Sequence, residues 1–228
     1  MTDEARASLR LAALVCPACG NDLDGLEADR VFGCSACARA YSVEAEGLQA
    51  APLVAWEADA PGEAVPLPVW VFEVEATVVL PSRARTSQPP GASAGDRLVP
   101  YADGPVYVAA FDLVGRGRFG DPGLHFTRRQ PQVRVRADGV LPRLAGATLS
   151  RSAAEALVAP TILSVVDARE DVLGGQVDPR IVSATLALVP FLPREDGGVT
   201  EPFGGVGYPP AALPDLAAIR VAGRKGSR

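Results

Sequence analysis

The chain has 228 residues and a formal net charge of −5, with 48% hydrophobic and 21% charged residues. This composition is that of a globular protein with a buried core, and it excludes an intrinsically disordered chain. The longest apolar run, residues 181–193, contains two prolines and is too short to cross a bilayer. The sequence therefore predicts a protein that does not bind a membrane.

The first residues indicate where the protein resides. Asp3 and Glu4 precede Arg6, so the basic and apolar layout of a secretory signal is lacking. All four cysteines fall in one metal-binding pattern, and thiolate ligands persist best where disulfides are disfavoured. We therefore expect a reduced, cytoplasmic location.

The four cysteines form two C-x2-C pairs, Cys16 with Cys19 and Cys34 with Cys37, separated by fourteen residues. Each pair can lie on a tight turn that directs two thiolates to one point, and the intervening residues suffice for a short hairpin. The spacing predicts a zinc ribbon over residues 1–43, with strands near residues 31–32 and 39–43. Four thiolates leave no open position for water, so we expect one Zn²⁺ with a purely structural role.

A linker is predicted after the ribbon. Residues 44–66 are acidic and contain three prolines, at positions 52, 61 and 66. The clearest strand of the chain, residues 67–80, follows it and is rich in β-branched and aromatic residues. Its alternation predicts Trp70, Phe72, Val74 and Ala76 on a core face. Residues 82–97, with Pro89 and Pro90, are predicted as a mobile loop.

Further strands are predicted at residues 105–113, 123–127, 133–136 and 181–191. Ser152 to Glu155 has the form of a capping box that opens a helix, which Pro160 is expected to end. A second helix is predicted at residues 214–221. The sequence thus predicts a small β zinc ribbon followed by an α+β, mainly β-sheet domain over residues 67–228.

Catalytic groups are sparse. His125 is the only histidine, no Gly-x-Ser-x-Gly motif is present, and no cysteine remains once the metal ligands are assigned. We interpret His125 as a partly buried side chain satisfied by a backbone carbonyl. The acidic group Asp167, Glu170 and Asp171 offers an alternative, a metal-dependent enzyme, but Arg169 and two following glycines favour a solvated loop end.

Charge is distributed unevenly. Residues 1–66 contain eleven acidic and four basic side chains, a net charge of −7, which argues against nucleic-acid binding by the ribbon. These carboxylates either solvate the ribbon or dock a basic partner. A basic group lies between residues 116 and 136 and comprises Arg116, Arg118, Arg128, Arg129, Arg134 and Arg136. These arginines could bind nucleic acid or a protein partner, or they could pair with the acidic ribbon.

Residues 11–47 resemble the small zinc-binding activator subunit of tRNA and protein methyltransferases and its short bacterial relatives. The order of features carries this resemblance, and the matching residues are Leu11, Leu14, Cys16, Pro17, Cys19, Leu23, Cys34, Cys37, Ala40, Tyr41, Val43 and Gly47. The resemblance implies a partner protein bound at an apolar edge, although Ser42 and Gln49 replace parts of that pattern here. The rest of the chain is similar only to parts of uncharacterised bacterial proteins.

Three functional hypotheses follow. The first is a non-enzymatic zinc-ribbon adaptor or accessory subunit, in which Zn²⁺ is structural and the sheet domain docks a protein partner. The second is a nucleic-acid-associated protein that uses the basic face, above all Arg128, Arg129, Arg134 and Arg136. The third is an enzyme that uses the carboxylates at Asp167, Glu170 and Asp171.

Overall fold

The computed structural model describes residues 14–57, 64–81, 96–136 and 141–225. The loop predicted at residues 82–97 lies outside the described residues except for its last two positions. A small antiparallel sheet comprises β1 (Val31–Cys34), β2 (Arg39–Glu44) and β3 (Gly47–Ala51). The strands of a second, eight-stranded sheet are β4 (Leu53–Ala55), β5 (Val65–Leu80), β6 (Arg97–Tyr101), β7 (Val106–Ala109), β8 (Gln176–Val177), β9 (Arg180–Pro193), β10 (Val199–Thr200) and β11 (Gly207–Tyr208).

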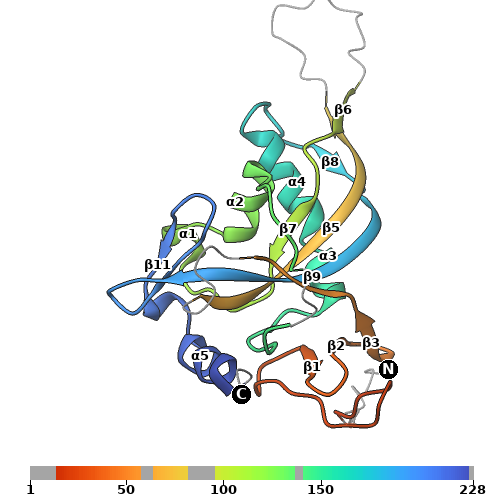
Figure 1. Cartoon of the computed structure of the whole chain (residues 1–228). Coiled ribbons are helices and arrows are strands. Elements are labelled where there is room, and N and C mark those ends of the chain that lie inside the picture. The colour runs from red at the N-terminus through yellow and green to blue at the C-terminus, as the bar shows by residue number, and fades with distance from the viewer. Residues whose placement is uncertain (1–13, 58–63, 82–95, 137–140, 226–228) are drawn as a thin grey trace, which may run out of the picture.

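Five α-helices and one 3-10 helix are described. They are α1 (Arg116–Phe119), α2 (Pro122–Arg129), α3 (Arg151–Glu155), α4 (Val158–Asp167), η1 (Pro210–Ala212) and α5 (Leu216–Lys225). Figure 1 shows α2 and α4 beside one half of the large sheet, with α5 near the small sheet at the other end. The prediction of a mainly β protein is confirmed.

The antiparallel pair β5 and β9 forms the centre of the large sheet. Their ladder runs from Val65 opposite Phe191 to Glu75 opposite Arg180, with a bulge between Glu73 and Val74. Both strands are long and rich in β-branched residues, as the sequence predicts. On its other edge β5 pairs first with β7 and then with β6, so one long strand connects several short ones.

Two hydrophobic clusters lie on opposite faces of β5. Trp70 and Phe72 belong to a cluster with α4, whereas Leu67 and Val69 belong to a second cluster with α2 and α5. All four side chains have an exposed fraction of 0%. The predicted core face is therefore buried as expected, but the opposite face of this part of β5 is buried as well.

Residues 123–127 form part of helix α2, so the strand predicted there is wrong. Asp121 is the N-cap, and its Oδ1 accepts hydrogen bonds from the N–H groups of Gly123 (2.8 Å) and Leu124 (3.2 Å). Pro122 occupies the first helical position, which suits its fixed φ and missing N–H. A side chain at Gly123 would meet the Tyr107 carbonyl oxygen, so this glycine lets α2 approach β7 closely.

Helices α3 and α4 also differ from the prediction. Ser150, not Ser152, caps α3 by accepting the N–H of Ala153 at 3.3 Å. Pro160 lies in the first turn of α4, where no intrahelical N–H is required, and therefore does not end a helix there. The predicted C-terminal helix is confirmed as α5 and extends to Lys225.

The stretch predicted as a linker contains β3, β4 and the buried side chain of Trp56. Strand β4 pairs in parallel with β9, from Leu53 opposite Leu186 to Ala55 opposite Leu188. A short strand flanked by proline gives little local signal, because its stability comes from this long-range pairing. The two sheets are thus joined by strands where the sequence indicates an irregular connection.

The small sheet also shares the larger core cluster, which includes Val31, Ala40 and Ala51. The N–H groups of Arg30 and Val31 both donate to the carbonyl oxygen of Ala147, at 2.6 and 3.1 Å. The residues before α3 therefore lie directly against β1.

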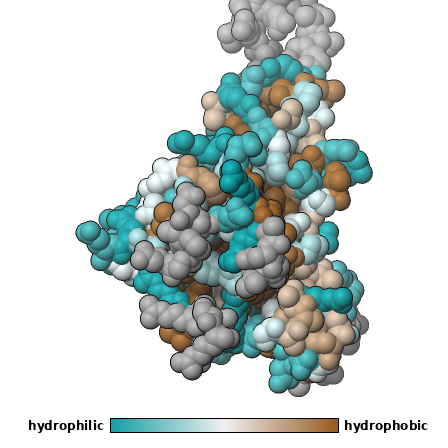
Figure 2. Space-filling view, viewed as in Figure 1, coloured by the Kyte–Doolittle hydropathy of each residue, from teal (hydrophilic) through white to brown (hydrophobic). Residues whose placement is uncertain are grey.

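None of the helices in the described part of the chain is long and apolar enough to span a bilayer. Among the described residues, several large hydrophobic side chains are exposed, and on the face in Figure 2 hydrophobic residues lie among hydrophilic ones. Exposed hydrophobic residues scattered in this way are common in globular proteins.

Glu44 at the end of β2 binds the start of α3. Its carboxylate accepts hydrogen bonds from the N–H groups of Arg151 (3.0 Å) and Ser152 (3.4 Å) and from Ser42 Oγ (2.5 Å). Burial raises the pKa of Glu44, but hydrogen bonds from Ser152, Ser42 and Arg151 outweigh burial and hold the pKa below its ordinary value. The ionised carboxylate therefore stabilises the folded chain.

We predict that Glu44→Gln lowers the free energy of unfolding by about 1 kcal/mol at neutral pH. We expect a loss of only this size because Glu44 is partly exposed and solvent screens its carboxylate. Because the folded pKa is depressed, this stabilisation is present above the ordinary pKa and is lost as the pH falls through the folded pKa. Urea unfolding at neutral pH and in acid measures both effects. Glu46→Gln, at an exposed site, is the control, and equal losses in the two variants would contradict the prediction.

Candidate metal centre

Each C-x2-C pair lies on a tight turn. In the first, the N–H of Gly20 donates to the Cys16 carbonyl oxygen at 2.9 Å, and Gly20 has a φ of 75°. In the second, the N–H of Ala38 donates to the Cys34 carbonyl oxygen at 2.9 Å, and Ala38 has a φ of 55°. The left-handed residue after each pair closes the turn so that both thiols of the pair point to the same side.

The four thiols converge on one point. All four Sγ atoms lie within 4.8 Å of one another, with Cys16 and Cys37 at 3.6 Å and Cys19 and Cys34 at 3.5 Å. None of the four forms a disulfide. This is the only group of three or more potential metal ligands among the described residues, and it could hold a metal ion.

The thiols differ in acidity when no cation is bound. Burial raises the pKa of Cys16, but hydrogen bonds from the N–H groups of Ala18 and Cys19 and from Tyr41 outweigh it and lower the pKa to about 6. Burial and the neighbouring thiols raise the pKa of Cys37 to about 12. A bound cation would remove this difference, because it stabilises all four groups as thiolates.

Two polar side chains support the ligands. Asn21 Nδ2 donates to Cys19 Sγ at 3.3 Å, and Tyr41 Oη lies 3.7 Å from Cys16 Sγ. Hydrogen bonds of this kind orient metal ligands and tune their basicity. Neither contact is indicated by the cysteine spacing, because each depends on how the turns fold around the thiols.

A contact with a buried carboxylate, which the sequence does not reveal, involves the only histidine. His125 Nε2 lies 3.1 Å from Oε1 of Glu201, whose side chain has an exposed fraction of 0%, although the contact lacks hydrogen-bond geometry. The Glu201 carboxylate also accepts the N–H groups of Phe203 (2.8 Å) and Val206 (3.4 Å). His125 therefore contacts a carboxylate where a backbone carbonyl is predicted, and the pair joins α2 to the β10–β11 hairpin.

The predicted basic face is divided among several elements. Arg128 and Arg129 lie in the last turn of α2, where Arg128 Nη2 donates to the Ser164 carbonyl oxygen at 2.9 Å. Arg134 and Arg136 lie on a segment with one isolated bridge, Trp56 to Val135, so the strand predicted there is not formed. The side chain of Arg116 lies outside the described residues, and Arg118 lies over the ring of Phe119. Binding of nucleic acid or protein by this face stays a prediction.

The three carboxylates considered for an enzyme do not form a metal-binding group in the described part of the chain. Glu170 forms a two-fold contact with Arg97, at 3.1 and 2.5 Å. Asp171 Oδ1 accepts the N–H of Leu173 at 3.1 Å, as expected of a loop end. The neighbouring Arg169 pairs with Asp103.

We predict that Cys34→Ser abolishes metal binding and lowers the unfolding temperature of the whole chain by about 10 °C. The effect should reach the large sheet because Val31 and Ala40 share a core cluster with Trp70. Metal analysis measures the loss of binding, and circular dichroism and tryptophan fluorescence follow the thermal unfolding of the chain. Ser35→Ala is the control. Loss of the small sheet alone, with the large sheet unfolding as before, would favour two independent modules.

We also predict that Glu201→Ala lowers the free energy of unfolding by about 2 kcal/mol, because it leaves His125 and two partly buried N–H groups without their carboxylate. Denaturant unfolding measures this loss. Glu195→Ala, at an exposed position nearby, should have little effect. A loss below about 1 kcal/mol for Glu201→Ala would show that the contacts of this carboxylate are not net stabilising.

Comparison with known proteins finds no protein-family model, no curated protein and no solved structure that matches the chain. The function is therefore inferred from the chain's own residues and their geometry.

Proposed function

We propose that this protein is a non-enzymatic adaptor or accessory subunit in which Cys16, Cys19, Cys34 and Cys37 hold one structural Zn²⁺ and the sheet domain docks a protein partner. The arrangement of the thiols is the observation that carries the metal assignment. A Zn–S distance of about 2.3 Å in a regular tetrahedron places sulfur atoms about 3.8 Å apart. The Sγ separations of 3.5 and 3.6 Å are close to this value.

The proposed role of the metal is structural. Four protein ligands fill a tetrahedral site, so no position remains for a substrate or an activated water. Cys16 and Cys34 are also buried, which favours stable ligation over exchange. When bound, Zn²⁺ would supply the charge that holds four thiolates together and so fix the two turns of the ribbon.

The adaptor role is supported by what surrounds the titratable groups. His125 is adjacent to the buried Glu201, and Glu170 is engaged by Arg97, so each has a structural partner. The small sheet is joined to the large one by a shared core, which would give a partner one rigid body to bind. Free thiols also suit a reducing compartment, so we propose a cytoplasmic location.

We predict one zinc ion per chain and a stoichiometric protein partner that survives nuclease treatment. Metal analysis of the purified chain tests the first point. Gentle affinity purification from the native host, with nuclease-treated and untreated halves and mass spectrometry of the bound proteins, tests the second. Material lost on nuclease treatment would instead support the basic face, and a chain that binds neither protein nor nucleic acid would contradict the adaptor proposal.

A further inference from the structure

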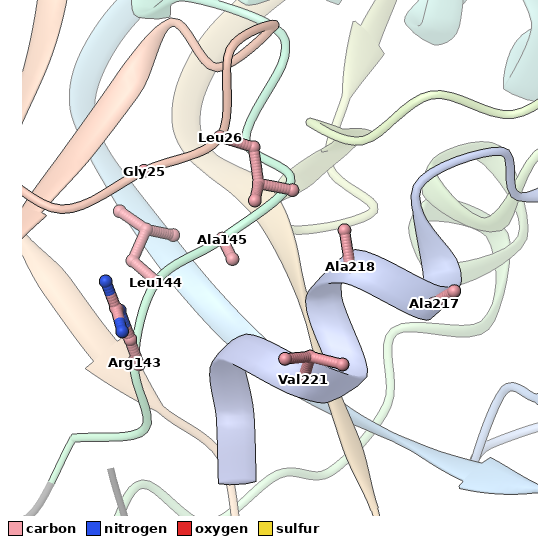
Figure 3. A pocket seen from close by; sticks show the side chains of 8 residues that line it. All are labelled: Gly25, Leu26, Arg143, Leu144, Ala145, Ala217, Ala218 and Val221. Atoms are coloured by element: carbon pink, nitrogen blue, oxygen red, sulfur yellow. The ribbon is translucent and has the colours of Figure 1, made fainter. Parts of the chain in front are cut away.

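A groove lies between α5 and the loop of the ribbon that precedes β1, residues 20–30, called the ribbon loop below. It has a volume of about 450 Å³ and is lined by Gly25, Leu26, Arg143, Leu144, Ala145, Ala217, Ala218 and Val221. Figure 3 shows the lining residues of the ribbon loop and of residues 143–145 on one side, with those of α5 on the other. Its volume falls in the range of sites that bind side chains or small ligands.

The walls of this groove are mostly apolar and fixed. Leu216 and Ile219 of α5 are each 3% exposed and anchor that helix to the core, so the opposite side of α5 lines the groove. Gly146 permits this packing, because a side chain there would lie 2.4 Å from Ile219 Cδ1. Val221 is 57% exposed at the rim, which leaves an apolar surface open to a partner.

The ribbon wall is acidic. Residues 21–29 contain four acidic side chains and no basic one. Asp24 is neutralised by Arg143 at 2.7 Å, and Asp29 is buried, but Glu27 is exposed beside Leu26 and has no ion-pair partner among the described residues. On the α5 side, Arg220 is directed to the carbonyl oxygen of Gly198 at 3.1 Å. A basic group would therefore be favoured on the ribbon side of the groove.

A second acidic group lies near this wall. The Asp29 carboxylate accepts the N–H groups of Leu26 (2.7 Å) and Gly146 (3.2 Å), so it ties the ribbon loop to the segment before α3. Burial raises the pKa of Asp29, and repulsion by Asp215 at the start of α5 adds to the increase. Asp215 thus lies near enough to Asp29 to interact with it, and it precedes the residues of α5 that line the groove.

The metal site holds the ribbon wall in place. Residues 20–33 connect Cys19 to Cys34, so both ends of this loop are fixed at the thiol cluster. The loop is also bonded within the ribbon: Leu23 N–H donates to the Leu14 carbonyl oxygen at 2.8 Å, and Asp24 and Gly33 exchange two hydrogen bonds. Without the metal this wall would lose the anchors at its two ends and would be held only by contacts such as those of Asp24 and Asp29.

We propose that this groove docks an apolar segment of a protein partner that carries basic residues on the side facing the ribbon loop, and that docking requires the metal-loaded site. Apolar side chains would insert between Leu26, Leu144 and Val221, and the basic residues would lie near Glu27. This inference rests on the proposed adaptor function and specifies the chemistry of the partner.

Two designed peptides test the proposal with the full zinc-loaded chain. Both form about four helical turns with leucines on one face, and they differ in carrying either arginine or glutamate at the remaining positions. Fluorescence anisotropy should show the arginine peptide binding about tenfold more tightly than the glutamate peptide. Removal of the metal with a chelator should abolish binding of the arginine peptide.

Matched variants locate the binding site. Val221→Arg should weaken the arginine peptide about tenfold, whereas Val182→Arg, at a valine of similar exposure on β9, adds the same charge and should have little effect. Glu27→Arg should weaken the arginine peptide and strengthen the glutamate peptide, with the exposed Glu46→Arg as its control. Circular dichroism confirms that each variant is folded.

In the peptide experiment, the proposal is overturned if the two peptides bind alike, if the arginine peptide does not bind, or if its binding survives metal removal. In the variant experiment, it is overturned if Val221→Arg and Val182→Arg change the affinity equally. Affinity purification with the Val221→Arg variant separates this inference from the adaptor function. A stoichiometric partner retained by Val221→Arg would refute the groove and leave the adaptor intact. A partner captured by neither the native chain nor the variant would refute the adaptor itself.

Discussion

The long ladder between β5 and β9 is the interaction on which the other parts depend. These two strands separate the core into two clusters. Every described helix except α1 contributes a buried side chain to one cluster or the other. The small sheet enters this arrangement through β4, which pairs with β9, and through Val31 and Ala40. The small sheet is therefore attached to the main core, and the thiols lie beside it in a separate cluster with Leu23, Phe32 and Tyr41.

Electrostatics reinforces the attachment of the ribbon. Glu44 accepts N–H groups at the start of α3, Asp29 accepts the N–H of Gly146, and Asp24 pairs with Arg143. Each of these contacts joins an acidic side chain of the ribbon to the residues between α2 and α4. The negative charge of the N-terminal part of the chain thus serves partly to bind the rest of the fold, as well as to solvate the ribbon.

Local patterns predicted part of the structure. The thiol cluster and the strands β5 and β9 were predictable, because fixed cysteine spacing and long β-branched runs act locally. Helix α2 was not, because its residues 123–127 include β-branched and aromatic types, and the stronger signal is Asp121 before Pro122. The contact of His125 with Glu201 could not be predicted, since it depends on how α2 meets a distant hairpin. Strand β4 likewise exists only through pairing with β9.

That parallel pairing has a consequence for how the chain can be divided. The edge of β9 at Leu186 to Leu188 is covered by residues 53–55, which belong to the N-terminal part of the sequence. A fragment beginning at residue 67 would retain most of the large sheet but expose the backbone N–H and C=O groups of this edge. Uncovered strand edges recruit other chains, so trimming the protein at its apparent sequence boundary would promote aggregation of the remaining sheet.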